Sequence, residues 1–265
     1  MTLPSNVPST KIADDKYILT TEGLTKEFKG FRAVDGVSLK VRRGHIHGLI
    51  GPNGAGKTTC FNLLTKFLQP NSGRIFFKGQ DITRMEAADV ARHGLVRSFQ
   101  ISATFGKLSV LENVRIALLR KHRGDAYDFW RHRSVLSTLN PEAMALLERV
   151  GLQSMATVPA AQLSYGRKRA LELATTLALD PEMLLLDEPT AGMAQEDVER
   201  TTALIRDVSR DRTVLIVEHN LPVLSILCNR LTVLALGRVL VEGDYATVSR
   251  DSRVIDSYLG AGYDD

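Results

Sequence analysis

A glycine-rich stretch that ends in lysine and two threonines carries the clearest chemistry in the sequence. It reads GPNGAGKTT and comprises Gly51, Pro52, Asn53, Gly54, Ala55, Gly56, Lys57, Thr58 and Thr59. The glycines let the backbone turn tightly and direct successive N–H groups toward an anion at the start of a helix, where the helix dipole also favours negative charge. Lys57 adds a positive charge for β- and γ-phosphates, and the Thr58 hydroxyl can ligate Mg²⁺. The stretch therefore predicts a phosphate-binding P-loop, with an ordinary glycine-rich turn as the alternative.

Two adjacent carboxylates, Asp187 and Glu188, follow the short apolar run Met183–Leu186 and precede Pro189. Such a run is typical of a buried parallel strand, and open α/β sheets bind their ligands at the carboxyl ends of strands. Asp187 is suited to hold Mg²⁺ through water, and Glu188 to act as general base for the attacking water. Adjacent acids alone are usually surface charge, so the upstream P-loop is what favours the catalytic interpretation.

Three further residues are candidates for the nucleotide site only because the chain also contains a P-loop. His219 follows the apolar run Thr213–Val217 and can reach a γ-phosphate from the same sheet edge, although a lone histidine after a strand is usually structural. Phe28 lies upstream of the P-loop, where an aromatic ring can stack on a purine, although a lone phenylalanine usually belongs to the core. Gln100 closes a strand-like segment and indicates nothing by itself.

The rest of the chain alternates strand-like and helix-like segments, which predicts an α/β fold. Strands are expected at Ile18–Leu24, Val37–Val41, Ile46–Ile50, Arg74–Phe77, Leu95–Phe99, Met183–Leu186 and Thr213–Val217, with a closing hairpin at Leu231–Leu236 and Val239–Val241. Helices are expected after the P-loop and at Ala87–His93, Val110–Leu119, Pro141–Val150, Lys168–Leu179, Gln195–Ser209, Tyr245–Arg250 and Val254–Leu259. The first two strands form a small β-layer, and we expect a polar loop between them that holds Phe28, Gly30 and Phe31.

Composition narrows the class of protein. The 265 residues are 44% hydrophobic, which is ample for a packed core, and the net charge of +4 is mild, so nucleic-acid binding is not expected. Cys60 and Cys228 have no metal-binding spacing, which favours a reducing compartment and no structural zinc. No apolar run approaches the ~18 residues of a membrane span, and residues 1–15 lack the apolar segment of a signal peptide, so a cytoplasmic protein is expected.

A basic segment at 120–134, RKHRGDAYDFWRHRS, has Tyr127, Phe129 and Trp130 interleaved with its charges. One interpretation is a solvated connector between helices. The other is a face that meets a membrane-embedded partner or the lipid surface.

With these residues in order, the chain resembles the nucleotide-binding subunits of ATP-binding cassette (ABC) transporters from about Ile18 to Gly260. The stretch Leu163–Arg169, LSYGRKR, is similar to the LSGGQ-like signature that separates this family from other P-loop ATPases. The resemblance implies a RecA-like P-loop NTPase core, an N-terminal antiparallel β-layer and an inserted α-helical subdomain. The implied boundaries are flexible tails at 1–16 and 261–265, a core at 17–99 and 178–243, a helical subdomain at 100–177 and C-terminal helices at 244–260.

The resemblance also implies residue roles. Phe28 would stack on adenine, and Gly51–Thr59 would bind the ATP phosphates. Gln100 would form a Q-loop that links Mg²⁺ and water to the helical subdomain, so that Thr58, Gln100 and Asp187 surround the metal. Asp187 would be the Walker B acid, Glu188 the catalytic base and His219 the switch histidine.

In this family two cassettes sandwich two ATP molecules, so the signature would face the ATP of the opposite subunit. Its residues here are Ser164, Tyr165, Gly166 and Arg167, of which Ser164 and Gly166 would contact the γ-phosphate. Tyr165 replaces the usual first glycine, Arg167 the usual glutamine, and Ala194 stands where many cassettes carry an acidic residue of the D-loop. Because both acids after the apolar run match the family, hydrolysis is still expected.

Within the family, the tyrosine in the signature, the AG pair after LDEPT, VEH followed by Asn, and a C-terminal YLG are most similar to the branched-chain amino acid importer cassettes. The implied protein hydrolyses ATP with Mg²⁺ in a homodimer or paired heterodimer of cassettes. It drives solute import through membrane permease subunits at the cytoplasmic face of the inner membrane, fed by a periplasmic binding protein. Alternatives are a soluble ABC ATPase that acts on nucleic acid or ribosomes, or a cassette for another solute such as a lipid exporter. The amino-acid assignment is associational, because other subunits choose the solute.

Overall fold

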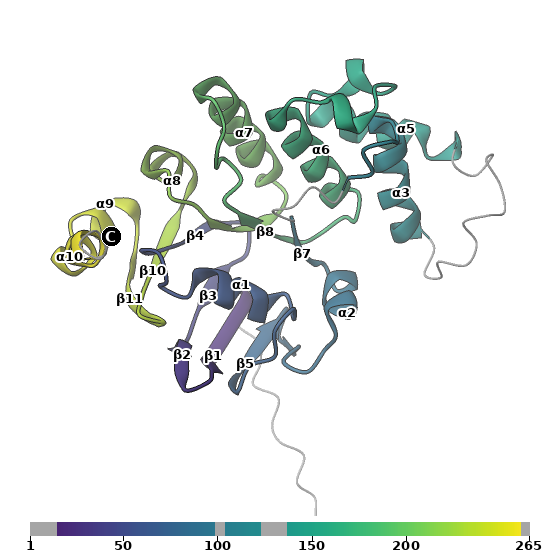
Figure 1. Cartoon of the computed structure of the whole chain (residues 1–265). Coiled ribbons are helices and arrows are strands. Elements are labelled where there is room, and N and C mark those ends of the chain that lie inside the picture. The colour runs from purple at the N-terminus through teal and green to yellow at the C-terminus, as the bar shows by residue number, and fades with distance from the viewer. Residues whose placement is uncertain (1–14, 99–103, 123–136, 261–265) are drawn as a thin grey trace, which may run out of the picture.

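The described chain, residues 15–98, 104–122 and 137–260 of a computed structural model, folds into an antiparallel sheet, a mostly parallel sheet and a group of helices (Figure 1). The predicted α/β fold with an N-terminal antiparallel β-layer is confirmed. Several predictions fall on residues outside these ranges: most of the tail at 1–16, the tail at 261–265, Gln100, Tyr127, Phe129 and Trp130.

The antiparallel sheet has the strand order β2-β1-β5-β6, with β3 beside β1. Its strands are β1 (Tyr17–Phe28), β2 (Phe31–Val37), β3 (Lys40–Arg42), β5 (Ser72–Phe77) and β6 (Gln80–Asp81). The polar loop predicted around Phe28 and Phe31 is wrong, because these two residues pair across a β-hairpin. Only Lys29 and Gly30 connect the strands, and both have positive φ, 49° and 89°, as tight hairpin turns require. The end of β1 is polar and exposed, so its sequence resembles that of a loop. Only its pairing with β2 identifies it as a strand.

The larger sheet has the order β11-β10-β4-β9-β8-β7 and is parallel except for β11. Its strands are β4 (Ile46–Ile50), β7 (Leu95–Arg97), β8 (Met183–Asp187), β9 (Thr213–Val217), β10 (Arg230–Ala235) and β11 (Arg238–Gly243). Every residue of β4, β8 and β9 is buried, as their mostly apolar sequences predict for strands covered on both faces. Their parallel pairing places the residues that follow each strand at one common edge.

The helices are α1 (Lys57–Leu64), α2 (Ala87–Arg92), α3 (Val110–His122), α5 (Asn140–Arg149), α6 (Tyr165–Leu177), α7 (Gln195–Val208), α8 (Leu221–Leu227), α9 (Tyr245–Ser249) and α10 (Ser252–Gly260). Short 3₁₀ turns lie at Gln153–Met155 and Ala160–Gln162. Helix α6 begins at Tyr165, three residues before the predicted start, so the signature is its first turn. Helix α8 was not predicted, although Asn220 accepts a hydrogen bond from the Val223 amide and caps it ahead of Pro222. No described helix is long and apolar enough to cross a membrane.

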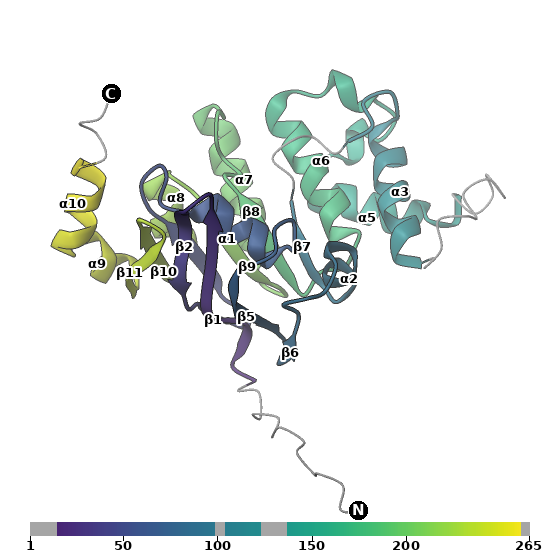
Figure 2. The ribbon, with the colours of Figure 1, turned by 60° about the horizontal axis from the view of Figure 1, so that its bottom comes forward.

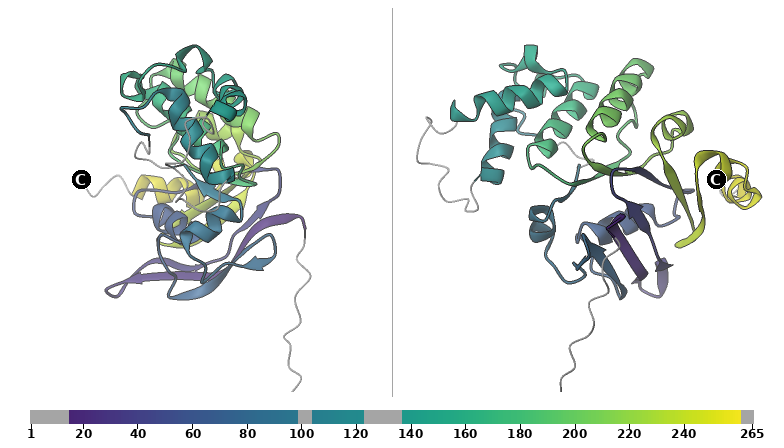
Figure 3. Two further views of the ribbon diagram at one scale, coloured as in Figure 1. Left: turned by 90° about the vertical axis from the view of Figure 1, so that its right-hand side faces the viewer. Right: turned by 180° about the vertical axis from the view of Figure 1, so that it is seen from behind.

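The two faces of the parallel sheet belong to different parts of the core. Along β8, Leu184 and Leu186 pack toward the helices between α3 and α8, whereas Met183 and Leu185 pack toward α1 and the antiparallel sheet. Figure 2 shows β1, β2 and β5 in front of α1. In the side view of Figure 3, the antiparallel sheet and the helices of residues 110–208 lie at opposite ends of the molecule. The parallel sheet therefore lies between α1 on one face and the helices from α3 to α8 on the other.

Candidate functional site

The P-loop connects β4 to α1, in the predicted strand, loop and helix order. Gly56, with φ of 97°, occupies the N-cap position of α1, and a Cβ there would lie 2.3 Å from the Ala33 carbonyl oxygen. At Gly51, with φ of 150°, a Cβ would lie 2.1 Å from the Leu234 carbonyl oxygen. Only glycine fits at both positions, because the loop is pressed against neighbouring backbone from two strands.

Lys57 is folded back over the loop that precedes it. Its Nζ donates hydrogen bonds to the carbonyl oxygens of Gly51 (2.7 Å) and Pro52 (2.8 Å), and the residue is 7% exposed. Burial lowers the pKa of Lys57, while the negative charges of Glu188 and Asp187 act in the opposite direction. The amine, the two carboxylates and the loop therefore belong to one electrostatic site. The Thr58 side chain follows directly at an exposed position.

The predicted pair of acids lies at the carboxyl edge of the parallel sheet, where β8 ends. Asp187 is 4% exposed and pairs with Val217 of β9, and the Glu188 amide donates to the Val217 carbonyl oxygen at 2.8 Å. Glu188 has a φ of 47°, in the left-handed region that non-glycine residues rarely adopt and that is found repeatedly at functional sites. The sharp turn after Asp187 gives the two adjacent acids different environments.

His219 is brought to Glu188 by the pairing of β8 with β9. The distance between His219 Nε2 and Glu188 Oε1 is 3.1 Å, within hydrogen-bonding range, and both side chains keep partial access to solvent, 41% and 29%. A carboxylate and an imidazole in contact at a sheet edge are suited to hold and orient a water molecule.

Glu218 is a residue of this edge whose importance the sequence did not reveal. It is 3% exposed, and its Oε1 accepts hydrogen bonds from the amide (3.1 Å) and the hydroxyl of Thr190. Its Oε2 accepts from the amide of His219 at 2.9 Å. The carboxylate thus joins the segment after Pro189 to the segment that carries the histidine. The signals available were a charged residue directly after the mostly apolar run Thr213–Val217 and its place in the VEH segment.

Arg97 is a second residue whose role the sequence did not indicate. It is the last residue of β7, and its Nη2 donates to Asp187 Oδ2 at 2.5 Å. The neighbouring strand β8 provides the contact, so nothing in the local sequence of either residue predicts it.

The predicted signature residues lie at the start of α6. Ser164 is the N-cap residue and makes no side-chain capping hydrogen bond, while Tyr165 is half exposed. Gly166 rests against α7, because a Cβ there would lie 2.6 Å from the carboxyl carbon of Asp197. Within the described residues, no hydrogen bond joins 164–167 to the P-loop at 51–59. The single chain therefore contains two separate candidate phosphate-binding segments.

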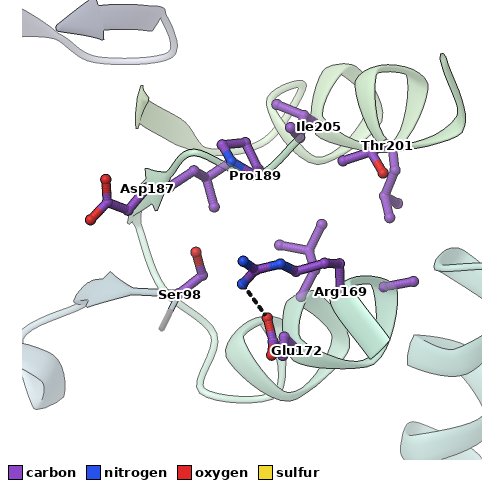
Figure 4. Close-up of a pocket in the computed structure, with 11 residues that line it drawn as sticks. Ser98, Arg169, Glu172, Asp187, Pro189, Thr201 and Ile205 are labelled. Carbon is purple, nitrogen blue, oxygen red and sulfur yellow. Dashed lines mark hydrogen bonds and ion pairs between the residues drawn. The ribbon is translucent and has the colours of Figure 1, made fainter. Parts of the chain in front are cut away.

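Tyr165, which stands where the usual signature has glycine, is held by the next turn of its own helix. Its hydroxyl accepts a hydrogen bond from Arg169 Nη2 at 3.1 Å, and the Arg169 guanidinium lies 5.4 Å from the centre of its ring. Arg169 also donates to Glu172 at 2.9 Å beside a cavity of about 30 Å³ between β8, α6 and α7 (Figure 4). Such a cavity has room for about one water molecule, so it is too small for a substrate.

The other predicted site residues have few contacts that indicate a role. Phe28 is 42% exposed at the β1–β2 hairpin, with Lys26 Nζ lying 5.3 Å from the centre of its ring. Ala194 is the N-cap residue of α7, and Arg167 is exposed. Gln100 lies outside the described residues, three positions beyond the end of β7.

The sequence and the fold were compared with those of known proteins. The family described as ABC transporter matches residues 34–191. The chain is 35% identical to the high-affinity branched-chain amino acid transport ATP-binding protein BraF of Pseudomonas aeruginosa, over 92% of this chain and 98% of that protein. It is 34% identical to LivG of Escherichia coli K12, which has the same description, with the same coverage. Among solved structures, an ATP-binding cassette of an ABC transporter in its ADP conformation superposes with a TM-score of 0.81 and 31% identity, covering 92% of this chain and 99% of the other.

Proposed function

The chain belongs to the ABC transporter family, and from this premise we propose that it is the ATP-binding subunit of an importer for branched-chain amino acids or related solutes. Its relatives with this description match 92% of this chain and 98% of their own length, well beyond the cassette motifs. ATP binding and hydrolysis are the activities of this family of ATPases. The alternative that acts on nucleic acid or ribosomes is not favoured, because these relatives are transport proteins.

The contact between His219 and Glu188 carries the proposal for hydrolysis. Glu188 Oε1 is the proton acceptor for the attacking water, and His219, at 3.1 Å, orients that water and the carboxylate toward the γ-phosphate. Phosphoryl transfer needs mainly positioning and neutralisation of charge, which the P-loop amides and Lys57 provide. On nucleotide binding, Lys57 exchanges its two carbonyl partners in the loop for the β- and γ-phosphates.

The residues present fit a Mg²⁺ ion at the edge between α1 and β8. The described residues include no group of three or more His, Cys, Asp or Glu that could hold a metal, so protein ligands alone do not build the site. An exposed threonine hydroxyl at Thr58 and the carboxylate of Asp187 are hard oxygen donors of the kind that bind Mg²⁺ together with phosphates and water. When bound, the ion neutralises phosphate charge, and Gln100 is proposed as its third neighbour.

The start of α6 is proposed to complete the site of a second cassette. The Ser164 hydroxyl is not engaged in capping its own helix, and the first amides of α6 point out of the helix N-terminus. Ser164 and Gly166 would contact the γ-phosphate held by the opposite subunit, beside Tyr165 and Arg167. Isolated monomers should then bind ATP and hydrolyse it poorly.

The remaining features of the proposal follow from family membership. Phe28, exposed at the β1–β2 hairpin, stacks on adenine. The cassette forms a homodimer or a paired heterodimer and binds membrane permease subunits at the cytoplasmic face of the inner membrane. A periplasmic binding protein supplies the solute, and residues 17–260 act as one nucleotide-binding domain. Uptake of labelled leucine in cells that express the chain together with candidate permease subunits would test the solute, and uptake that is independent of the chain would refute it.

Replacing Glu188 by Gln tests the catalytic proposal directly. We expect ATP affinity to be retained, because the P-loop is unchanged, and phosphate release to fall to a small fraction of the original rate. Phosphate is measured colorimetrically and ATP binding by equilibrium titration, with Glu199→Gln on the exposed face of α7 as the matched control. Normal phosphate release from Glu188→Gln would show that another group accepts the proton.

A further inference from the structure

Arg97 connects the P-loop helix to the strand that ends in Asp187. Its Nη2 donates to Asp187 Oδ2 at 2.5 Å, and its Nη1 donates to Asn62 Oδ1 on α1 at 2.6 Å. Its guanidinium carbon also lies 5.8 Å from the centre of the Phe61 ring, on the same helix. The side chain is therefore held from two sides by α1 and by β8, although it belongs to β7.

The ion pair is shielded from water. The side chain of Asp187 is 3% exposed and that of Arg97 12%. Removing one member of such a pair leaves the other as a buried charge without compensation, which destabilises the native arrangement. Arginine suits this position because its planar guanidinium presents donors in a fixed geometry and can also stack on an aromatic ring.

The contacts of Arg97 join Asp187 to the helix that carries Thr58, and both of these residues are proposed neighbours of the Mg²⁺ ion. Helix α1 begins with Lys57 and Thr58, and it also carries Phe61 and Asn62. Strand β8 ends with Asp187, whose carboxylate points away from the pocket in Figure 4. By bridging α1 and Asp187, Arg97 sets where the Asp187 carboxylate stands relative to the helix that bears Thr58.

We propose that Arg97 is a positioning residue for the metal site: it occupies Oδ2 of Asp187 and leaves the other carboxylate oxygen to the Mg²⁺ that would accompany ATP. This inference rests on the proposed role of Asp187 as a magnesium ligand. The residues that orient metal ligands commonly affect metal affinity although they do not touch the ion. Arg97 thus prepares the carboxylate before nucleotide binds.

The test is the Mg²⁺ dependence of nucleotide binding in the full-length protein. Arg97→Met removes the charge and both hydrogen bonds while keeping an apolar stem against Phe61. We expect the affinity for a fluorescent ATP analogue in excess EDTA to be unchanged. The Mg²⁺ concentration that half-saturates the metal-dependent signal should rise by about 10- to 100-fold, the usual effect of losing a group that orients a metal ligand. Mn²⁺ binding followed by electron paramagnetic resonance provides a second readout that does not depend on turnover.

Three variants make the outcome unambiguous. Arg92→Met removes an exposed arginine that pairs with Asp89 on α2, and it should leave the Mg²⁺ dependence unchanged. Arg97→Lys keeps the charge and should show an intermediate rise, so it carries the test if Arg97→Met does not fold. Asp187→Asn should abolish most of the Mg²⁺ dependence.

Two results would overturn the inference while leaving the proposed function intact. Unchanged Mg²⁺ affinity in both Arg97 variants would limit Arg97 to a structural role, and tighter Mg²⁺ binding would mean that Arg97 competes with the ion for Asp187. If Asp187→Asn itself kept normal Mg²⁺ dependence, the proposed metal site would fail instead.

Discussion

Replacing Glu218 by Gln tests whether a buried carboxylate holds together the sheet edge that carries Glu188 and His219. In the structure, Glu218 accepts hydrogen bonds from the backbone amides of Thr190 and His219, one on each carboxylate oxygen. Glutamine has almost the same shape but only one acceptor oxygen. If that oxygen faces Thr190, the NH₂ group is turned toward the amide of His219, where two donors oppose each other.

The size of the effect follows from this loss. One poorly exposed amide left without its acceptor costs about 1–3 kcal/mol in the free energy of unfolding. In a chain of this size, each kcal/mol lowers the melting temperature by about 2–4 °C. Because the unpaired amide belongs to His219, whose ring contacts Glu188 at 3.1 Å, we expect phosphate release to fall together with stability.

The assay combines thermal unfolding with phosphate release on the same preparations. Glu199→Gln is the control, since it makes the same chemical change on the exposed surface of α7 and should shift neither quantity. If Glu218→Gln melts at the original temperature and releases phosphate at the original rate, the hydrogen bonds from Thr190 and His219 do not support the site.

Two further predictions concern groups whose pKa values are shifted by burial. His47 is 1% exposed and hydrogen-bonded to Thr232, and burial lowers its pKa to about 4, so its neutral form is favoured in the folded state. Because the unfolded chain takes up the proton near pH 6.5, stability should decrease as pH falls, by about 2 kcal/mol between pH 7.5 and pH 5 from this group. Urea unfolding should show a smaller pH dependence for His47→Gln than for the original protein, and equal slopes would contradict this. Burial raises the pKa of Cys60 and of Cys228 to about 12 each, so iodoacetamide at pH 8 should label both thiols only after denaturation, as counted by mass spectrometry. Rapid labelling of Cys60 in the folded protein would show that the P-loop helix opens.

Many of the candidate site residues can be predicted from the sequence, because each is marked by the residues next to it in the chain. The P-loop needs glycines with positive φ next to a lysine and a hydroxyl, and all of these residues are consecutive in the chain. Strands β4, β8 and β9 are recognisable because strands buried on both faces are apolar along most of their length. The acids at 187 and 188 and the histidine at 219 are placed together by one general rule, that parallel strands present their carboxyl ends at one edge.

Sequence alone therefore determined the kind of chemistry, the fold class and the bounds of β4 and β9, whereas β8 extends one residue beyond its predicted end, to Asp187. The tertiary structure decided the contacts between residues that are distant in the chain. Strand β8 lies between β7 and β9 in the sheet. Arg97 contacts Asp187 because β7 neighbours β8, and Glu218 contacts Thr190 because β9 does too. The sequence of one strand does not reveal which strands will lie beside it. The β1–β2 hairpin was likewise missed, because an exposed strand becomes distinguishable from a loop only when its partner satisfies its backbone hydrogen bonds.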